Sequence, residues 1–263
     1  MRAIVFHEHG PLENVTLADV PKPEIGPNEV LVEIKAAALN RLDLWVLAGW
    51  PGLNLKLPHI MGSDGAGIVA EVGANVSRFT RGDRVAINPT ICNDCDDEFA
   101  RRGLDNMCAD FAIMGEHTDG FFAEYTAVPA RNLLKMPDHA NFEDAAAASL
   151  VFVTAWHSLI TRGNLRPGES VLVVGAGGGV NTAAIQIAKH AGAGPIYVIG
   201  STDEKLAQAQ SLGADVLINR QDENWSKAVY KLTNRRGVDV VVDNVGAATF
   251  TSSLRALKRG GRL

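Results

Sequence analysis

The chain has 263 residues, of which 46% are hydrophobic and 21% are charged, a balance typical of a globular protein with a substantial core. Its length suits one large domain or two ordinary ones. A formal net charge of −5 argues against nucleic acid or an anionic membrane surface as the main partner.

The N-terminal stretch and the cysteines both indicate the compartment. The first residues, MRAIVFHEHG, predict a short strand and lack the apolar core of a secretory signal. No uninterrupted apolar run is long enough to span a bilayer. The three cysteines are odd in number and clustered, which fits a reducing compartment better than a disulfide framework. We therefore expect a cytoplasmic protein with no membrane partner.

The first 140 residues show the alternation of period two that predicts β-strands. One short helix is expected among them, over Arg41–Ala48, and it ends at Gly49. Many prolines and glycines separate the strands, which is typical of an all-β domain with long connections, such as a partly open barrel. The expected strands are Arg2–Phe6, Val15–Val20, Glu29–Ala37, Ala66–Val72, Asp83–Ile87 and Ala123–Val128.

From residue 141 onward, strands and helices alternate. Asn141 is expected to cap a long alanine-rich helical segment that runs to Thr161. A buried strand that begins at Val171 and a helix that reaches Lys189 follow. Strands alternating with helices of about ten residues predict a parallel, doubly wound α/β sheet over residues 141–263. Its further elements are expected as strands at Pro195–Gly200, Asp215–Asn219 and Asp239–Val245, and as helices at Asp203–Leu212, Asn224–Asn234 and Ala247–Leu257.

A glycine-rich turn joins the first strand and helix of this α/β region, in the segment VLVVGAGGGVNTAAIQIAK. Gly177, Gly178, Gly179 and Val180 place backbone with little side-chain bulk at a helix N-terminus, which is a suitable site for a diphosphate. The spacing differs from G-x-G-x-x-G, because Asn181 stands where the last glycine is usual. An ordinary flexible turn is the alternative, but the strands and helices that follow favour a nucleotide cofactor.

Several motifs occur in one order along the whole chain. They are AAALNRLDLWVLAGW, PHIMGSDGAGIVAEVG, GDRVAINP, a cysteine cluster, GEHTDGFFAEYTAVP, FVTAW, the glycine turn and VDVVVDNVG. Together they resemble the medium-chain dehydrogenase/reductase superfamily, in its zinc-type alcohol dehydrogenase and quinone or enoyl reductase branch. The resemblance implies a GroES-like catalytic domain at residues 1–140 and a Rossmann domain at residues 141–263. Because a strand begins at Gly260 just before the sequence stops, we expect a chain truncated at its C-terminus.

The resemblance also identifies the positions where zinc-dependent members hold a catalytic metal. There this chain has Asn40, Ser63 and Leu150, in place of a Cys, a His and a second Cys or Asp. None of these is a good zinc ligand, and Asp64 beside them would lack partners. We therefore expect a site without catalytic zinc. Such a site suits a quinone or an enone, because the charge that develops during their reduction is already delocalised.

Four residues are candidates for the catalytic region. Asn40 and Asp43, in ALNRLD, are candidates for contact with substrate or nicotinamide, because this motif resembles the reductase version. The alternative is structural, with Asn40 as the N-cap and Asp43 at position N3 of the short helix. Ser63 and Asp64 follow a glycine, and their structural alternative is a turn. The sequence identifies no side chain as the proton donor, and water can serve.

A cysteine-containing segment at residues 88–110 predicts a metal-binding lobe. Cys92, Cys95, Glu98 and Cys108 follow the spacing C-x2-C-x2-E-x9-C, and three thiolates with one carboxylate complete a tetrahedral structural zinc site. The family's structural-zinc lobe has four cysteines at similar spacing. A degenerate lobe without metal is the alternative. The identity of the acidic ligand stays open, because further acids lie nearby at Asp94, Asp96, Asp97 and Asp110.

The end of the second strand of the α/β region bears on which nicotinamide cofactor binds. NAD-specific sites have an acid there to hold the ribose 2′-hydroxyl, whereas this chain has Ser201 and Thr202. These hydroxyls, together with the charges of Lys205 and Arg220, favour a 2′-phosphate, so we predict NADP(H). The family motifs imply further cofactor contacts at Thr154, Asn244 and Val245.

These features predict an NADPH-dependent oxidoreductase that lacks a catalytic zinc and reduces quinones or α,β-unsaturated carbonyls by hydride transfer. One alternative is an alcohol or aldehyde dehydrogenase, as the name of the family suggests. Another is a non-catalytic NADPH-binding or sensing protein, which the lack of an evident acid or base permits. The expected partner is a small electrophilic substrate rather than nucleic acid. The resemblance also implies a homodimer or homotetramer for the full-length protein.

Overall fold

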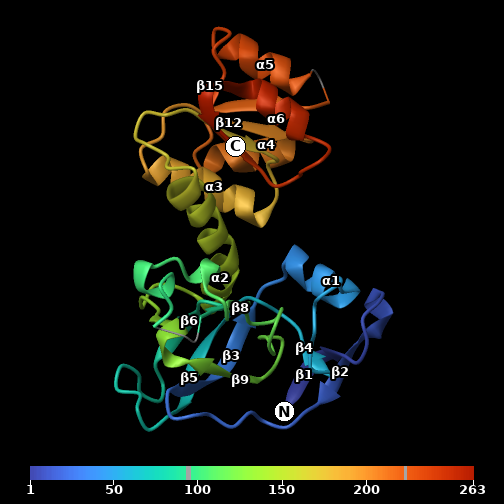
Figure 1. Ribbon diagram of the computed structural model, residues 1–263, viewed down its shortest axis with the longest axis vertical. Coiled ribbons are helices and arrows are strands. Elements are labelled where there is room, and N and C mark those ends of the chain that lie inside the picture. Colours follow the sequence, from blue (N-terminus) through green and yellow to red (C-terminus); the bar gives the residue numbers. More distant parts are fainter. Residues whose placement is uncertain (93–95, 222–223) are drawn as a thin grey trace. The chain divides into compact units, whose positions relative to one another are not determined.

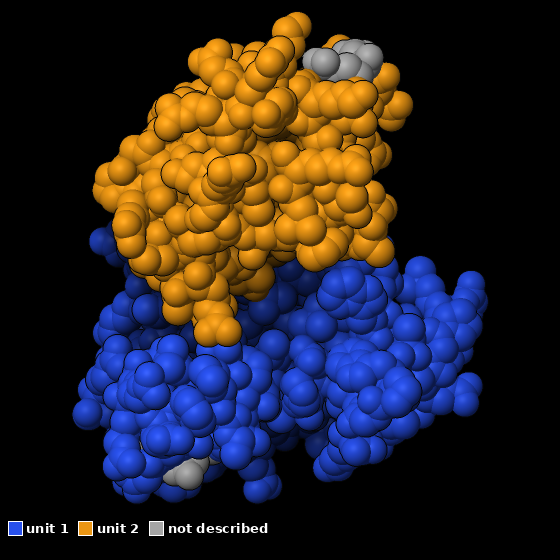
Figure 2. Space-filling model, turned by 45° about the horizontal axis from the view of Figure 1, so that its top comes forward, with its two compact units in different colours: residues 1–150 blue, residues 151–263 orange. Residues whose placement is uncertain are grey.

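The computed structural model describes residues 1–92, 96–221 and 224–263. The chain forms two compact units, Met1–Leu150 and Val151–Leu263 (Figure 1), which Figure 2 shows in different colours. The division falls inside helix α2 (Phe142–Trp156), later than the boundary at residue 140 that the sequence suggests. Each unit has its own buried apolar clusters.

Unit 1 is built on a five-stranded antiparallel sheet with the order β10-β6-β5-β3-β9. Alternate residues of its strands point to one apolar core, as Val30 and Val32 do from β3 and Val85 and Ile87 from β6. This period-two burial is the pattern that the sequence showed. The strands are β3 (Glu29–Ala37), β5 (Gly65–Val72), β6 (Arg84–Ile87), β9 (Tyr125–Pro129) and β10 (Leu133–Lys135).

Smaller elements complete unit 1. A three-stranded sheet has the order β2-β1-β4, and β7 pairs with β8. Helix α1 (Arg41–Ala48) begins after Asn40 and ends at Gly49, whose φ of +73° favours glycine. The remaining elements are β1 (Arg2–Phe6), β2 (Val15–Asp19), β4 (His59–Ile60), β7 (Thr90–Ile91), β8 (Ala112–Ile113) and 3₁₀ turns at Leu12–Asn14, Ala100–Arg102, Asp105–Met107 and Ala130–Asn132.

Helix α2 begins as the sequence predicted. The Asn141 Oδ1 atom accepts a hydrogen bond from the backbone N–H of Asp144 at 2.7 Å, which is an N-cap contact. A π-helical segment, His157–Arg162, continues the helix. By length and composition, Phe142–Arg162 is the one helical stretch among the described residues that could cross a membrane. Core helices of globular proteins meet the same criterion, so the expectation of no membrane partner stays a prediction.

Unit 2 contains a five-stranded parallel sheet with the order β13-β12-β11-β14-β15, which confirms the predicted doubly wound architecture. Val171 and Val173 pack in the apolar cluster that includes α3 and α4, whereas Leu172 and Val174 pack in the cluster that includes α5 and α6. Helices therefore cover both faces (Figure 1). The elements are β11 (Val171–Val174), α3 (Gly179–His190), β12 (Ile196–Gly200), α4 (Asp203–Ser211), β13 (Val216–Asn219), α5 (Trp225–Leu232), β14 (Val238–Asp243), α6 (Phe250–Ala256) and β15 (Leu257–Arg262).

The strands and helices predicted from the sequence are confirmed, with ends that shift by at most three residues. The strands that the sequence did not reveal are β4, β7, β8 and β10, which have two or three residues each. A segment of that length is too short to show an alternation of buried and exposed side chains. Pairing with distant strands defines these segments, and pairing partners are not visible in the local sequence.

Candidate functional site

The glycine turn lies directly between β11 and α3. Gly175 has a φ of +113°, which favours glycine, and its N–H donates to the carbonyl oxygen of Ile199 at 3.0 Å. The N–H of Thr182 donates to the carbonyl oxygen of Gly178 at 2.9 Å, and no described side chain caps α3. The N–H groups of the first turn are therefore available to an anion, at the positive end of the helix dipole.

The space around the three exposed glycines differs from one to the next. A Cβ on Gly179 would lie 2.9 Å from Val151 Cγ1, so packing excludes a side chain there. A Cβ on Gly178 would meet only Asn181 Nδ2, at the ordinary distance of 3.8 Å, and the φ of Gly178 is −90°. The fold thus accepts a side chain at Gly178. Packing therefore does not explain why this position is a glycine. Close approach of a diphosphate to the backbone does explain it.

Two cations lie at the carboxyl end of β12, next to the glycine turn. The stem of Lys205 in α4 passes over Gly177, since a Cβ on that glycine would lie 3.2 Å from Lys205 Cδ. The backbone N–H of Arg220 donates to the carbonyl oxygen of Gly200 at 2.9 Å, which brings Arg220 to the same strand end. Neither cation forms an ion pair with another described residue.

Hydroxyl groups complete this strand end. Ser201 follows β12 directly, and the Oγ1 atom of Thr202 accepts from the N–H of Lys205 at 3.4 Å, which caps α4. The nearby acid, Asp203, accepts a hydrogen bond from Asn219 Nδ2 at 2.9 Å. The structure therefore brings together the residues that the sequence assigned to the adenosine side of a cofactor.

The turn also touches the carboxyl end of β14. Asn181 Nδ2 donates to the carbonyl oxygen of Val174 at 3.0 Å, and Asn244 Nδ2 donates to Asn181 Oδ1 at 2.7 Å. Val245 follows, and its N–H donates to Asp243 Oδ1 at 2.9 Å. The sequence prediction treated Asn181 only as a departure from the glycine pattern. An amide side chain in the place of the usual glycine is the signal that could have identified it.

Thr154 is exposed on α2, three residues after Val151, whose side chain contacts the glycine turn. Its assignment to the cofactor stays a prediction.

In unit 1, hydrogen bonds join three of the predicted catalytic residues, Asn40, Asp43 and Asp64, and Ser63 is the chain neighbour of Asp64. Asp64 Oδ2 accepts from Asn40 Nδ2 at 2.8 Å, and Asp64 Oδ1 accepts from the backbone N–H of Leu150 at 2.7 Å. Asp43 Oδ2 accepts from the backbone N–H of Asn40 at 2.6 Å. The capping box considered for Asn40 and Asp43 is therefore present, and the Nδ2 atom of Asn40 is directed to Asp64. Ser63 precedes Asp64 and is fully buried.

Burial dominates the electrostatics of this group. Asp43 is 4% exposed and Asp64 is 1% exposed. Burial raises the pKa of Asp64 from 3.8 to about 6, although the hydrogen bonds from Asn40 and Leu150 act in the opposite direction. Burial raises the pKa of Asp43 as well. The buried Asp43 Oδ1 and Ser63 Oγ atoms have no hydrogen-bond partner among the described residues.

The donor set of this group does not fit a catalytic zinc ion. Zinc in enzymes is held mainly by thiolate, imidazole and carboxylate groups. Here the amide of Asn40 and both oxygens of Asp64 already bind each other or backbone, and Leu150 has no donor side chain. Ser63 offers only a neutral hydroxyl. A metal at this place would need to break these hydrogen bonds, and the group offers it the carboxylates of Asp43 and Asp64 but no thiolate and no imidazole.

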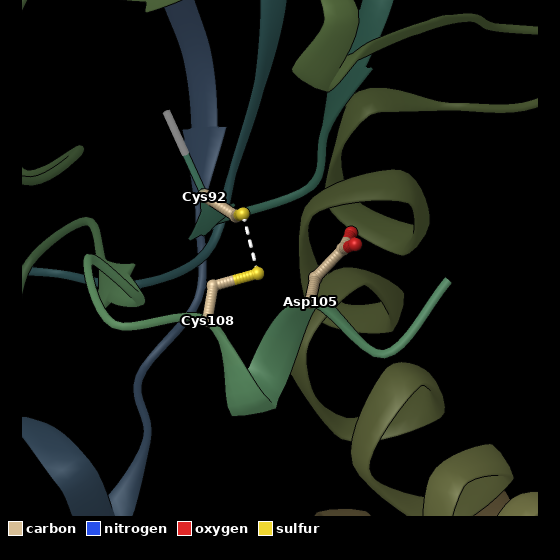
Figure 3. A group of neighbouring side chains, drawn as sticks. All are labelled: Cys92, Asp105 and Cys108. Atoms are coloured by element: carbon tan, nitrogen blue, oxygen red, sulfur yellow. Dashed lines mark hydrogen bonds between the residues drawn. The ribbon is translucent and has the colours of Figure 1, made fainter. Parts of the chain in front are cut away.

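The predicted metal-binding lobe presents a different donor set (Figure 3). The sulfur atoms of Cys92 and Cys108 and a carboxylate oxygen of Asp105 lie within 4.8 Å of one another, which fits three corners of a zinc site. Cys95 lies outside the described residues. Glu98 is exposed and is not part of this group, so its assignment as a ligand stays a prediction. Asp105 is a carboxylate that the sequence reasoning missed.

The sulfur atoms of the two described cysteines lie close together. They are 2.6 Å apart, and the hydrogen bond with Cys108 raises the pKa of the Cys92 thiol to about 12. Zinc binds thiolates, so metal uptake here should release protons.

Substitution can decide which carboxylate holds the metal. We expect wild-type protein purified without chelator to contain about one equivalent of zinc, bound with tetrahedral geometry. Asp105→Ala should lose more than half of that zinc, because one corner of the site is removed, whereas the matched change Glu98→Ala should keep it. Elemental analysis measures both. Zinc lost only from the Glu98 variant would assign the ligand to Glu98, and less than a tenth of an equivalent in the wild type would exclude the site.

Comparisons with known proteins find a matching family model in each half of the chain. The family model for the alcohol dehydrogenase GroES-like domain matches residues 26–138, and the model for the zinc-binding dehydrogenase domain matches residues 179–263. A zinc-type alcohol dehydrogenase-like protein of Schizosaccharomyces pombe is 37% identical over 270 aligned residues, which cover 100% of this chain and 75% of that protein.

Solved structures extend the comparison. One described as an NAD-dependent alcohol dehydrogenase is 45% identical, with a TM-score of 0.96, and the match covers 100% of this chain and 76% of that one. A quinone oxidoreductase of Pseudomonas syringae pv. Tomato is 31% identical, with a TM-score of 0.81, over 100% of this chain and 75% of that one.

Proposed function

Because the chain belongs to the zinc-type alcohol dehydrogenase-like branch of the medium-chain dehydrogenase/reductase superfamily, and is therefore an NAD(P)-dependent oxidoreductase, we propose that it reduces quinones or α,β-unsaturated carbonyls with NADPH and without a catalytic zinc. Its GroES-like domain and its Rossmann domain, both implied by the sequence motifs, are confirmed. The observation that carries the proposal is the hydrogen-bonded group around Asp64, which leaves a catalytic metal without a ligand set.

The chemistry follows from the missing Lewis acid. Oxidising an unactivated alcohol requires removal of its hydroxyl proton, and that hydroxyl is a weak acid. A catalytic zinc ion makes this easier because it binds and polarises the alcohol oxygen. A quinone or a conjugated carbonyl delocalises the incoming charge over its own π system, so hydrogen bonds and positioning suffice. When bound, the nicotinamide supplies the hydride. Water supplies the proton that completes the reduction.

The residues of the group around Asp64 divide into two roles. Asn40 is the half-buried member, and it is the candidate for contact with substrate or nicotinamide. Asp43, Ser63 and Asp64 are at most 4% exposed, which suits positioning residues rather than groups that touch substrate. Asp64 orients the Asn40 amide, and Asp43 holds the Asn40 backbone.

The residues of unit 2 fit the proposed cofactor. The bare first turn of α3 receives the diphosphate, with Gly177, Gly178, Gly179 and Val180 as the contact surface. Ser201, Thr202, Lys205 and Arg220 surround the place of a 2′-phosphate at the end of β12. We also propose a cytoplasmic location and a homodimeric or homotetrameric full-length protein, with no nucleic-acid partner.

Cofactor preference gives a direct test of the β12 end. We expect NADPH to bind at least about tenfold more tightly than NADH, because this strand end carries two hydroxyls and two cations that form no ion pair with the described residues. Fluorescence titration of both dinucleotides measures the ratio. Lys205→Ala should reduce the preference, whereas Lys231→Ala, which removes an exposed lysine from α5, should not. Tighter binding of NADH, the cofactor named for the 45% identical structure, would contradict this assignment.

Alcohol dehydrogenase activity is the second candidate, favoured by the names of two of the relatives described above. A steady-state screen separates the two. Turnover of quinones or enones that is insensitive to chelators supports the proposal. Oxidation of primary or secondary alcohols that chelators abolish would replace it.

A further inference from the structure

The order in which the strands of the unit 2 sheet are added reverses between β11 and β14, although all strands of the sheet are parallel. From β11 the chain builds β12 and β13 on one side, then returns to build β14 and β15 on the other. In such sheets a dinucleotide lies over the carboxyl ends of the strands at this reversal point. The β12 side holds the adenosine half, so the end of β14 belongs to the half that carries the nicotinamide.

One buried side chain joins the two strand ends at the reversal point. Asn181 is 6% exposed, and both polar atoms of its amide are hydrogen-bonded: the nitrogen donates to Val174 at the end of β11, and the oxygen accepts from Asn244 just after β14. A glycine at position 181, as in the usual pattern, could make neither contact. The chain therefore has a connection across the reversal point that the usual glycine sequence lacks.

This connection fixes how Asn244 presents its own amide. The nitrogen of Asn244 is held by Asn181, so its oxygen is left as an acceptor on an exposed residue. The backbone beyond it is held too, because the N–H groups of Val245 and Gly246 donate to Asp243 Oδ1 at 2.9 and 3.2 Å. A fixed acceptor recognises a donor group on a ligand.

We propose that Asn181 is a positioning residue, which orients Asn244 so that its amide oxygen accepts a hydrogen bond from a hydroxyl of the nicotinamide-side ribose. The ribose is the group bonded directly to the diphosphate, and Asn244 directly contacts the turn that receives the diphosphate. The proposal rests on the proposed dinucleotide site. The family motifs imply only that residues at the end of β14 contact the cofactor. The proposal adds which group of the cofactor Asn244 binds and which residue orients it.

The test compares a whole dinucleotide with a fragment. Asn181→Gly and Asn244→Ala should each weaken binding of the dinucleotide that the wild type prefers by about tenfold, the effect of one lost hydrogen bond. Binding of 2′,5′-ADP, which lacks the second ribose, should change by less than twofold. The double variant should bind no more weakly than Asn244→Ala alone, because Asn181 acts through Asn244. Isothermal titration calorimetry measures all of these, with Gln210→Ala as a control for loss of an exposed amide on α4.

Different results identify different failures. If Asn181→Gly weakens 2′,5′-ADP as much as the dinucleotide, Asn181 only shapes the turn and the inference is overturned. If Asn181→Gly does not fold, Asn244→Ala decides alone, and unchanged dinucleotide binding by that variant overturns the inference. A wild-type chain that binds neither NADPH nor NADH would overturn the proposed function as well, which separates the two outcomes.

Discussion

Replacing Gly178 with valine should abolish useful dinucleotide binding while the protein stays folded. The fold has room for this side chain, because Gly178 has an extended conformation with φ −90° and ψ 146°, and a Cβ there meets a single atom at 3.8 Å. The added branches would stand over the N–H groups that open α3. Phosphate oxygens could then no longer reach the hydrogen-bond distance of about 2.9 Å. We expect affinity for NADPH to fall by about 100-fold or more.

The measurement pairs binding with stability. Gly178→Val and the control Gln186→Ala, which lies further along α3, should both melt within a few degrees of the wild type. The reason is that glycine and valine differ by only about 1 kcal/mol at an N-cap. Only the Gly178 variant should lose binding in calorimetric titration. Unchanged affinity in a folded Gly178→Val protein would show that the dinucleotide does not lie on this turn.

Asp64 should make the protein less stable as the pH rises from 4 to 6. Its pKa is about 6 in the folded state and 3.8 when unperturbed. Between these values the folded chain holds a proton that the unfolded chain has released. Unfolding therefore releases a proton, and the free energy of unfolding falls with increasing pH until the folded group also ionises near pH 6. Between pH 4.5 and 7 this one group should remove roughly 2 kcal/mol.

Asp64→Asn isolates this contribution. The amide oxygen can still accept from the N–H of Leu150, and the Asn40 amide can turn to accept from the new nitrogen, so both contacts are retained without a titrating group. Urea unfolding at pH 4.5 and pH 7 should give a difference in unfolding free energy between wild type and variant that changes by roughly 2 kcal/mol. Asp138→Asn, an exposed control, should leave the pH dependence unchanged. If the difference in unfolding free energy between wild type and Asp64→Asn is the same at both pH values, the raised pKa of Asp64 is contradicted.

Much of the site follows from local sequence, and the remainder depends on contacts between distant residues. The glycine turn, the hydroxyls at Ser201 and Thr202, and the helix that begins after Asn40 were all predicted, because turn chemistry and periodic burial act over a few neighbouring residues. The hydrogen bond between Asp64 and Leu150 joins positions that are 86 residues apart in the sequence. The hydrogen bond between Asn181 and Asn244 joins positions that are 63 residues apart. No local pattern specifies such pairs.

The sequence by itself determined the two-domain organisation, the doubly wound sheet and the family, because each is encoded by periodicity or by an ordered motif. Only the tertiary structure decided that Asp64 accepts hydrogen bonds from Asn40 and Leu150. It also decided that Asp105 lies near the two cysteines and that Asn181 connects β11 to β14. The physical reason is that hydrogen bonding and metal ligation depend on distances of about 3 Å between atoms, and the packing of distant strands and helices sets those distances.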